Sequence, residues 1–236
     1  MQNKNKLLKK TSYALIFSLI TFTAQAITEK DITWEIFKRK NGVTVYQGKH
    51  KDPKSGITPL KVSTILNHPP SRVIAVLVNS KRKLTWLPKL EESYPLEIIS
   101  PFDRVEYSRY SSPWPFDDRT FVVKSTGVFD KKNQEVRIMI KSVDHPKAPK
   151  NKKYVRALTT FGVMRLKPLD NYTKTYYEMI FLSDFKGKIP IWIINMVSLN
   201  WPFKLFKALK RQLTKKDIVV PKEYYIKQYL ENSNQI

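Results

Sequence analysis

Alternating apolar and polar positions, the period of a half-buried β-strand, recur along most of the chain after about residue 30. Residues 34–49, WEIFKRKNGVTVYQGK, make two such runs around Asn41-Gly42, a dipeptide typical of two-residue hairpin turns. Residues 58–66 predict a third strand. Because only short connections join the strand candidates that follow, we predict an antiparallel meander. These candidates are residues 94–100, 104–111, 119–129, 135–143, 153–169 and 174–185.

Two segments change to a helical period of about 3.6 residues. In PPSRVIAVLVNSKRKLTWLPKL the prolines and Ser71 start a helix that we expect to end near Ser80, with a short helical turn before Pro88. The second helical segment covers about residues 189–213. Its first part, PIWIINMVSLNW, is apolar nearly all round, so we expect it to be buried on most sides and kinked at Pro202. Beyond this proline, one apolar stripe consists of Phe206, Leu209 and Leu213.

A helix, a long antiparallel sheet and an unusually apolar last helix together predict an α+β fold. In this fold a curved antiparallel sheet of about nine strands wraps around the long C-terminal α-helix. Such a sheet leaves room for an internal cavity, and an ordinary filled core is the alternative. We take residues 27–216 as one domain, because no repeat or long linker divides them. Residues 217–236, with KEYYIKQYL, form a C-terminal tail in which we expect a short helix.

Residues 1–26 have the organisation of a secretory signal peptide. MQNKNKLLKK carries four lysines, TSYALIFSLITF is an apolar run too short to span a bilayer comfortably, and AQA has the small-x-small pattern of a signal-peptidase site. We predict cleavage after Ala26, with an uncleaved N-terminal anchor as the alternative. The expected location is the bacterial periplasm, with secretion as the second choice.

The charge and the cysteine content narrow the choice of partners. The chain has no cysteine, so it has neither a lipoprotein anchor nor disulfides, and an exported domain of this kind depends on its core alone. Its formal net charge is +23, and loss of the four signal-peptide lysines leaves +19. This excess predicts attraction to polyanions. Export argues against nucleic acid, as does the lack of zinc-finger spacing and of an RNA-binding strand motif, so we expect an anionic membrane surface as partner.

The sequence lacks common metal-ligand spacings and common catalytic motifs. His50, His68 and His145 lie far apart, with no H-x-H or H-E-x-x-H spacing, so we predict no metal site and no cofactor. The chain also lacks a G-x-S-x-G elbow, a P-loop and a cysteine nucleophile. Nothing in the sequence therefore supports an esterase, and we expect the protein to be a monomer.

Two motifs resemble those of START domains, the steroidogenic acute regulatory protein-related lipid-transfer family. SPWPFDDRTFVV, residues 112–123, is similar to the family's P-W-P-x-x-x-R-D-F-V pattern, with Thr120 in place of the usual acid. DFKGKIPIWIINM, residues 184–196, is similar to the family's D-x-K-G-x-(I/L)-P-x-W-(I/L)-(I/V)-N run into its last helix. The motifs lie the expected distance apart and the strand order between them agrees, so the resemblance covers about residues 28–215.

The resemblance implies a helix-grip fold that holds one lipid in an internal hydrophobic tunnel, with no catalysis and no metal. It also implies that the last helix and the loop holding Trp114 cover the tunnel entrance. We favour a phospholipid as the ligand, although a sterol or another isoprenoid would fit the same walls. The favoured function is transfer of this lipid between membranes or to a partner. A lipid sensor or scaffold, and a helix-grip enzyme that acts on a hydrophobic small molecule, are the alternatives.

The loop around Trp114 is the first candidate for membrane contact. Pro113 and Pro115 restrict this loop, which also carries Phe116, and tryptophan favours the bilayer interface. The alternative is that Trp114 packs down on the last helix as a plug. Basic residues beyond Pro202 are further candidates, for contact with anionic phosphates, and solubility is their alternative role. They are Lys204, Lys207, Lys210 and Arg211.

Charged residues inside the strands are candidates for the ligand's headgroup. Glu106 occupies the position of an acid that often lies inside START domains, and Ser125 replaces the family's usual basic partner. Either another cation, Arg137 or Arg156, supplies the positive charge, or the headgroup is different. A solvated outer face is the alternative for each. Apolar candidates for lipid contact on the last helix are Trp192, Ile193, Met196, Val197 and Leu199. Structural roles are expected for Arg119, which would pair with a neighbouring carboxylate, and for Asp184, Gly187, Pro190 and Asn195.

Overall fold

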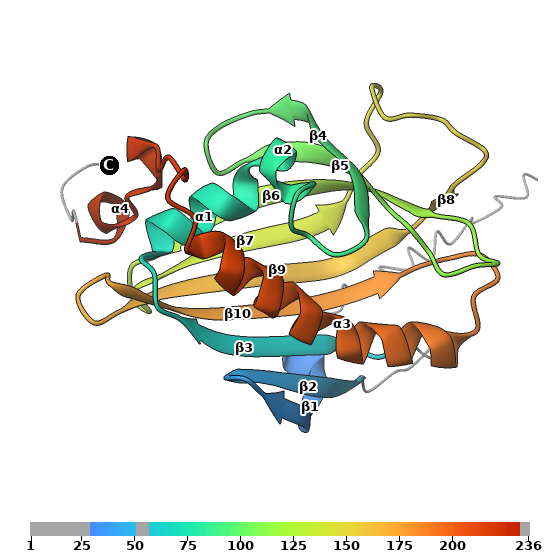
Figure 1. The fold of residues 1–236 in the computed structure, drawn as a ribbon, viewed down its shortest axis with the longest axis horizontal. Coiled ribbons are helices and arrows are strands. Elements are labelled where there is room, and N and C mark those ends of the chain that lie inside the picture. Colours follow the sequence, from blue (N-terminus) through green and yellow to red (C-terminus); the bar gives the residue numbers. More distant parts are fainter. Residues whose placement is uncertain (1–28, 51–56, 232–236) are drawn as a thin grey trace, which may run out of the picture.

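The computed structural model describes residues 29–50 and 57–231, and the predicted signal peptide lies outside them. Within this part of the chain a single sheet makes up most of the fold (Figure 1). Its strands are β1 (Ile32–Lys40), β2 (Val43–His50), β3 (Leu60–Leu66), β4 (Leu90–Ile98), β5 (Arg104–Tyr110), β6 (Arg119–Asp130), β7 (Glu135–Ser142), β8 (Val155–Arg156), β9 (Leu158–Leu169) and β10 (Lys174–Asp184).

The order of the strands in space is β1-β2-β3-β10-β9-β7-β6-β5-β4. From β4 to β10 the long strands are neighbours in chain order and antiparallel, as the meander prediction requires, while the short β8 pairs in parallel with β6. Strand β3 pairs with β10, so the first hairpin joins the sheet beside the last strand. The predicted α+β fold, an antiparallel sheet of about nine strands with a long C-terminal helix, is confirmed.

The turn between β1 and β2 has the geometry that its sequence predicts. Asn41 and Gly42 have φ angles of 53° and 70°, the left-handed values that a type I′ hairpin turn requires and that these two residue types adopt most easily. Lys40 pairs with Val43 across the turn, which therefore holds the Lys40 backbone beside the end of the hairpin.

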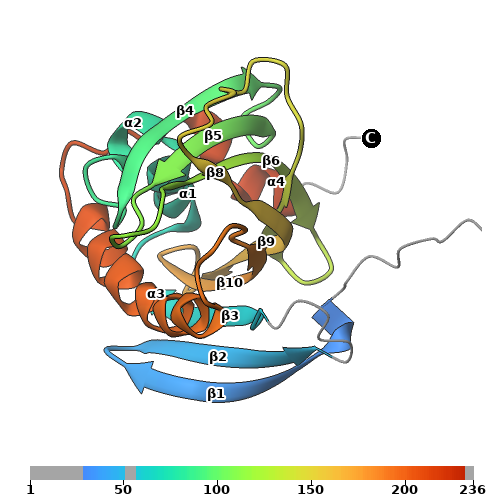
Figure 2. The ribbon, with the colours of Figure 1, turned by 90° about the vertical axis from the view of Figure 1, so that its right-hand side faces the viewer.

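In the described part of the chain, four α-helices accompany the sheet: α1 (Pro70–Val78), α2 (Ser80–Lys83), α3 (Ile191–Leu213) and α4 (Lys227–Glu231), with 3-10 turns η1 (Glu29–Asp31) and η2 (Lys222–Tyr224). Pro70 begins α1, where its missing N–H has no helical partner to lose. Helix α2 begins after Asn79, whose Oδ1 accepts a hydrogen bond of 2.9 Å from the Arg82 amide. Seen from the end, the sheet curls round and α3 lies across its open side (Figure 2).

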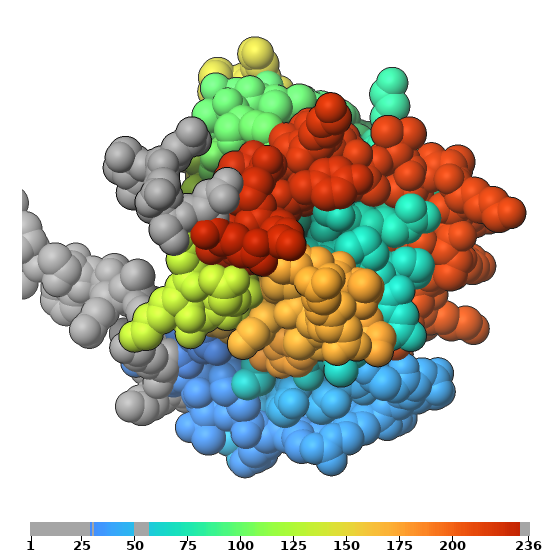
Figure 3. All heavy atoms as spheres, turned by 90° about the vertical axis from the view of Figure 1, so that its left-hand side faces the viewer, coloured from blue at the N-terminus to red at the C-terminus, as the bar shows by residue number. Residues whose placement is uncertain are grey.

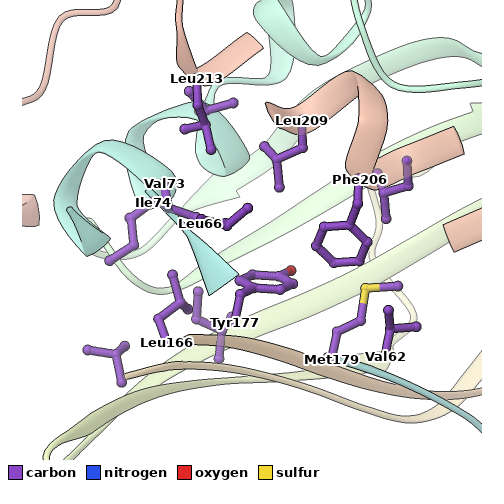
Figure 4. Close-up of a cluster of buried hydrophobic side chains, with 14 of the residues drawn as sticks. Val62, Leu66, Val73, Ile74, Leu166, Tyr177, Met179, Phe206, Leu209 and Leu213 are labelled. Carbon is purple, nitrogen blue, oxygen red and sulfur yellow. The ribbon is translucent and has the colours of Figure 1, made fainter. Parts of the chain in front are cut away.

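The main core lies between the inner face of the sheet, α1 and the second half of α3. Tyr177 on β10 and Phe206 on α3 meet edge to face, with ring centroids 5.4 Å apart (Figure 4). The predicted stripe of Phe206, Leu209 and Leu213 is buried in this core. The second half of α3 therefore fills one end of the space that the sheet encloses, which we call the cup.

The first half of α3 differs from the prediction. Figure 1 shows α3 bending between its first and second halves, and Pro202 lies inside the helix, as expected. The expectation that residues before this proline are buried on most sides is wrong, because Trp192 is 67% exposed and Met196 52% exposed. The composition of this half allowed burial all round, but the sheet covers only one side of the helix.

The C-terminal tail is part of the core. Figure 3 shows the red C-terminal segment lying across one end of the molecule. Ile226 and Leu230 are almost fully buried in the same core as α1 and α3. The rings of Phe129 and Tyr229 stack with centroids 4.4 Å apart. The tail thus closes the end of the cup that lies away from the first half of α3.

Leu230→Ala is expected to lower the free energy of unfolding by about 2 kcal/mol, because it deletes a buried side chain and leaves a cavity. Val219→Ala on the same tail is the control: Val219 is 82% exposed, and its loss should change stability by less than about 0.5 kcal/mol. Urea denaturation followed by tryptophan fluorescence measures both. Equal, small effects would show that the tail does not support the core.

Candidate functional site

The inner face of β5 carries an acid into the cup. Glu106 lies opposite Val123 of β6, and Val123 packs against the main core, so both side chains point inward. Glu106 is only 8% exposed. A carboxylate at such a position requires donors, because burial without them is costly.

Three donors from two neighbouring elements reach the same oxygen, Oε1, of Glu106. Ser80 at the start of α2 donates at 2.8 Å and Ser93 on β4 at 2.7 Å. Lys83 at the end of α2 completes the set with a salt bridge. The other oxygen, Oε2, accepts no hydrogen bond from a described residue. The carboxylate therefore holds α2 against β4 and β5 and keeps one oxygen available to a further donor.

Glu106 is ionised at neutral pH in this setting. Burial by itself would raise the pKa of Glu106, but the charge of Lys83 and the hydrogen bonds from Lys83, Ser93 and Ser80 outweigh it and lower the pKa below its ordinary value. The stabilisation that the ion pair supplies is consequently present above that ordinary value and is lost as the pH falls through the lowered pKa.

Neither of the arginines predicted to pair with Glu106 does so. Arg137 points to the outer face of β7, where it pairs with Asp130 at 2.5 Å and Glu135 at 2.6 Å. Arg156 donates to the Pro149 carbonyl and lies over the outward-facing ring of Tyr107. It also lines a hollow of about 570 Å³ on the outer face of the sheet, under the loop between β7 and β8.

The partner that the sequence analysis missed is Lys83. It belongs to the helical turn predicted before Pro88, and nothing in its local pattern distinguishes it from the neighbouring Lys81, which is exposed. Only the packing of α2 against β4 and β5 brings its ammonium to Glu106.

The side chains on the inner face of the cup are unevenly buried. At the end closed by the tail, the inward-facing side chains are almost fully buried: Leu166, Tyr177, Met179 and Phe206. At the end nearest the loop between β5 and β6, inward-facing side chains stay only half buried: Ser108, Phe121, Val123 and Phe181. Burial and the charge of Glu106 raise the pKa of Tyr110, which shares this inner face, so its hydroxyl remains a donor. This end of the cup combines incompletely covered apolar walls with one ion pair.

The loop between β5 and β6 lies at that end with its indole outside. Trp114 is 92% exposed, between the exposed Pro113 and Pro115, and Phe116 is half buried. The alternative in which Trp114 packs down as a plug is therefore not the arrangement in this structure. Figure 1 shows this loop and the start of α3 at one end of the molecule and the tail at the other.

Arg119 joins this loop to the segment that leads into α3. Its guanidinium donates to the carbonyl oxygens of Phe185 at 3.1 Å and Lys186 at 2.8 Å, and to that of Asp117. The prediction that Arg119 pairs with a neighbouring carboxylate is wrong, because Asp118 instead forms a 2.6 Å ion pair with Arg109. Three backbone carbonyls thus take the place that the sequence analysis assigned to a carboxylate.

The other motif residues shape the entry into α3. Asp184 accepts a 2.9 Å hydrogen bond from the Lys186 amide, and Gly187 has a φ of 71°, with room for no side chain beside Arg119. The Pro190 carbonyl accepts hydrogen bonds from the amides of Ile193 and Ile194 in the first turn of α3. Asn195 Oδ1 accepts a 3.2 Å hydrogen bond from the Thr58 amide.

A family model decides the relationship of this chain to known proteins. The model of the START domain matches residues 17–216. The chain belongs to the START domain family. No curated protein matches this START domain by sequence.

Solved structures share the fold. Human STARD10 superposes with a TM-score of 0.70 at 20% identity, over 83% of this chain and 78% of that chain. A STAR-related lipid transfer protein from Xanthomonas axonopodis gives a TM-score of 0.68 at 23% identity, over 77% and 99% of the two chains. Human StAR-related lipid transfer protein 5 gives 0.67 at 16%, over 76% and 86%. The family and this fold support lipid binding and transport in general.

The described residues show neither a metal centre nor a membrane-spanning helix. Across residues 29–50 and 57–231, no group of three or more histidine and acidic side chains is placed to hold a metal ion. Over the same ranges, no helix combines the length and apolar character needed to cross a bilayer.

Proposed function

We propose that this START domain binds a single phospholipid in the cup, between the sheet and α3, and transfers it between membranes of the bacterial periplasm without chemical change. The observation that carries this proposal is that inward-facing side chains at one end of the cup stay half buried, with the Lys83–Glu106 pair on the same wall. Apolar walls suit acyl chains, and an ion pair suits a headgroup that carries charge of both signs. The free Oε2 of Glu106 would accept from an ammonium or hydroxyl of the headgroup.

Moving a phospholipid through water without a carrier costs a large amount of free energy. A diacyl lipid has about thirty methylenes, and exposing them to water costs about 25 kcal/mol at about 0.8 kcal/mol each. Inside an apolar cup the chains leave one apolar medium for another, so the transfer is nearly balanced in free energy. What the protein must add is an entrance that opens and a surface that meets the membrane.

The exposed side chains at the entrance would supply that surface. Trp114 on its loop and Trp192 on the first half of α3 are both exposed, and Arg119 links the two segments. Met196 and Val197 extend the apolar surface along α3. Because Trp192, Met196 and Val197 face outward, they would contact bilayer lipid rather than a lipid bound inside the cup. Of the predicted ligand contacts on α3, Ile193 is half buried and Leu199 is buried in the core. Lys204, Lys207 and Arg211 are exposed further along and would attract anionic headgroups, an attraction that salt weakens.

Filling the open end of the cup is the direct test. Val123→Trp places a large ring opposite Glu106 on the inner face of β6, and we expect it to abolish co-purified lipid in native mass spectrometry and to slow vesicle-to-vesicle transfer by more than about tenfold. Lys124→Trp puts the same ring on the outer face of the same strand and should leave both unchanged. Val123→Ala, which keeps the cup open, should retain the lipid.

Four results would count against the proposal. If the wild-type protein purifies without any lipid, it does not hold the proposed ligand. If Val123→Trp transfers lipid at an unchanged rate, the cup is not the binding site. A bound phospholipid with no exchange between two vesicle populations would favour a sensor or scaffold instead. A bound sterol or isoprenoid would contradict the proposed lipid class alone.

A further inference from the structure

A second site lies outside the cup, between the β1–β2 turn and the second half of α3. There the structure has a groove of about 360 Å³. Four lysines line it, Lys40 from the hairpin and Lys204, Lys207 and Lys210 from α3, and its floor consists of Val43 and Phe203. We call this feature the lysine groove. Its volume falls within the range of small-molecule sites.

The positive charge of the groove is not neutralised within the described chain. No carboxylate of residues 29–50 or 57–231 forms an ion pair with any of the four lysines. The three helical lysines follow one another at spacings of three residues, which places them side by side on one ridge of α3, and like charges in this arrangement repel. A fourth ammonium brought by another element increases that repulsion. An anion held between them would relieve it.

One of the four is held in place. Lys210 Nζ donates a 3.1 Å hydrogen bond to the Asn41 carbonyl, which ties α3 to the hairpin turn. The turn geometry of Asn41-Gly42 in turn positions Lys40 on the opposite wall. Partial burial lowers the pKa of Lys210, so a charge placed beside it would be poorly screened by water. The groove therefore exists as a formed feature rather than as a set of independent surface side chains.

The floor selects among anions. Val43 is buried and Phe203 half buried, and both pack in the main core. A bare ion would leave the exposed part of Phe203 in contact with water, whereas an anion that carries a hydrocarbon group would cover it. Ammonium groups bind phosphate as compact point charges with three donors each, and a phosphate monoester offers up to two negative charges to them.

We propose that the lysine groove is a binding site for a phosphate monoester that carries an apolar group. This chemistry is shared by a lipid with a terminal phosphate in a membrane and by a soluble phosphorylated metabolite. The site is separate from the cup, so the proposal goes beyond lipid transfer and does not depend on it.

The test compares two double variants of the full chain that remove the same charge. Lys204→Ala/Lys207→Ala empties one wall of the groove. Lys215→Ala/Lys216→Ala, at exposed positions beyond the end of α3 and outside the groove, is the control. Binding of hexyl phosphate is measured by isothermal titration calorimetry. Binding to phosphatidylcholine vesicles that contain phosphatidic acid, or phosphatidylglycerol at matched surface charge, is measured by co-sedimentation.

We expect the groove variant to bind hexyl phosphate at least about tenfold more weakly than the wild type, and the control variant less than about threefold more weakly. The same difference on phosphatidic acid vesicles, clearly larger than that on vesicles with phosphatidylglycerol, would assign the ligand to a membrane lipid. A difference confined to hexyl phosphate would assign it to a soluble metabolite. If both variants lose the same affinity, the effect comes from net charge alone and the proposal is overturned. Absence of saturable binding to both hexyl phosphate and phosphatidic acid would also overturn it. Neither the calorimetry nor the co-sedimentation measures lipid transfer by the cup. The result for the lysine groove therefore does not depend on whether the proposed transfer function is right.

Discussion

Lys83→Met is expected to destabilise the protein by about 3 kcal/mol at neutral pH, because it leaves the buried carboxylate of Glu106 without its counter-charge. Methionine keeps most of the volume of the lysine stem, so little of the loss comes from packing. Chemical denaturation of the wild type and the variant measures the difference. Lys81→Met on the same helix removes an exposed charge and should change stability by less than about 0.5 kcal/mol.

A double variant separates the charge from the polar contacts. In Lys83→Met/Glu106→Gln the neutral amide can still accept hydrogen bonds from Ser80 and Ser93, and we expect most of the lost stability to return. If the double variant is as unstable as the sum of the single ones, the two residues are not coupled and the buried ion pair is not what stabilises this wall of the cup.

The loss of stability caused by Lys83→Met should also depend on pH. In the wild type the pKa of Glu106 lies below its ordinary value, whereas without Lys83 the burial that raises the pKa is no longer outweighed. The difference in stability is thus largest at neutral pH and shrinks in acid, as the carboxyl becomes protonated first in the variant and then in the wild type. A penalty that stays constant from neutral to strongly acidic pH would contradict this explanation.

Trp114→Ala/Trp192→Ala is expected to weaken binding to anionic vesicles by about a hundredfold. Burying two indoles at the interface contributes about 3 kcal/mol in total, and each tenfold change in affinity corresponds to about 1.4 kcal/mol. Both side chains are exposed, at 92% and 67%, so the variant should fold with nearly unchanged stability. Vesicle co-sedimentation at increasing salt measures the effect, and the part due to tryptophan should persist at high salt, whereas the lysine contribution is screened.

The matched control removes exposed apolar side chains at the other end of the molecule. Val219→Ala/Tyr225→Ala acts on the tail, which Figure 1 places away from the entrance. We expect this variant to bind vesicles like the wild type. Equal binding by all three proteins would exclude the entrance as the membrane-contact surface, and equal weakening by both variants would indicate unspecific apolar adsorption.

Local patterns in the sequence were sufficient for the architecture. Alternation predicted the strands, Asn41-Gly42 predicted the first turn, and the two motifs placed the Trp114 loop and the start of α3. These features depend on residues within a few positions of one another, where backbone preference and side-chain period act directly. The apolar stripe of the second half of α3 was predicted for the same reason.

The site was decided by contacts between distant segments. Lys83, rather than Arg137 or Arg156, pairs with Glu106, since in an alternating strand only the register decides which charges face inward, and only helix packing decides which cation arrives there. The outward exposure of Trp192, the joining of Lys40 to the lysines of α3 and the burial of Leu230 arise in the same way. The curvature of the sheet determines which faces of α3 and the tail it covers, and no short stretch of sequence encodes that curvature by itself.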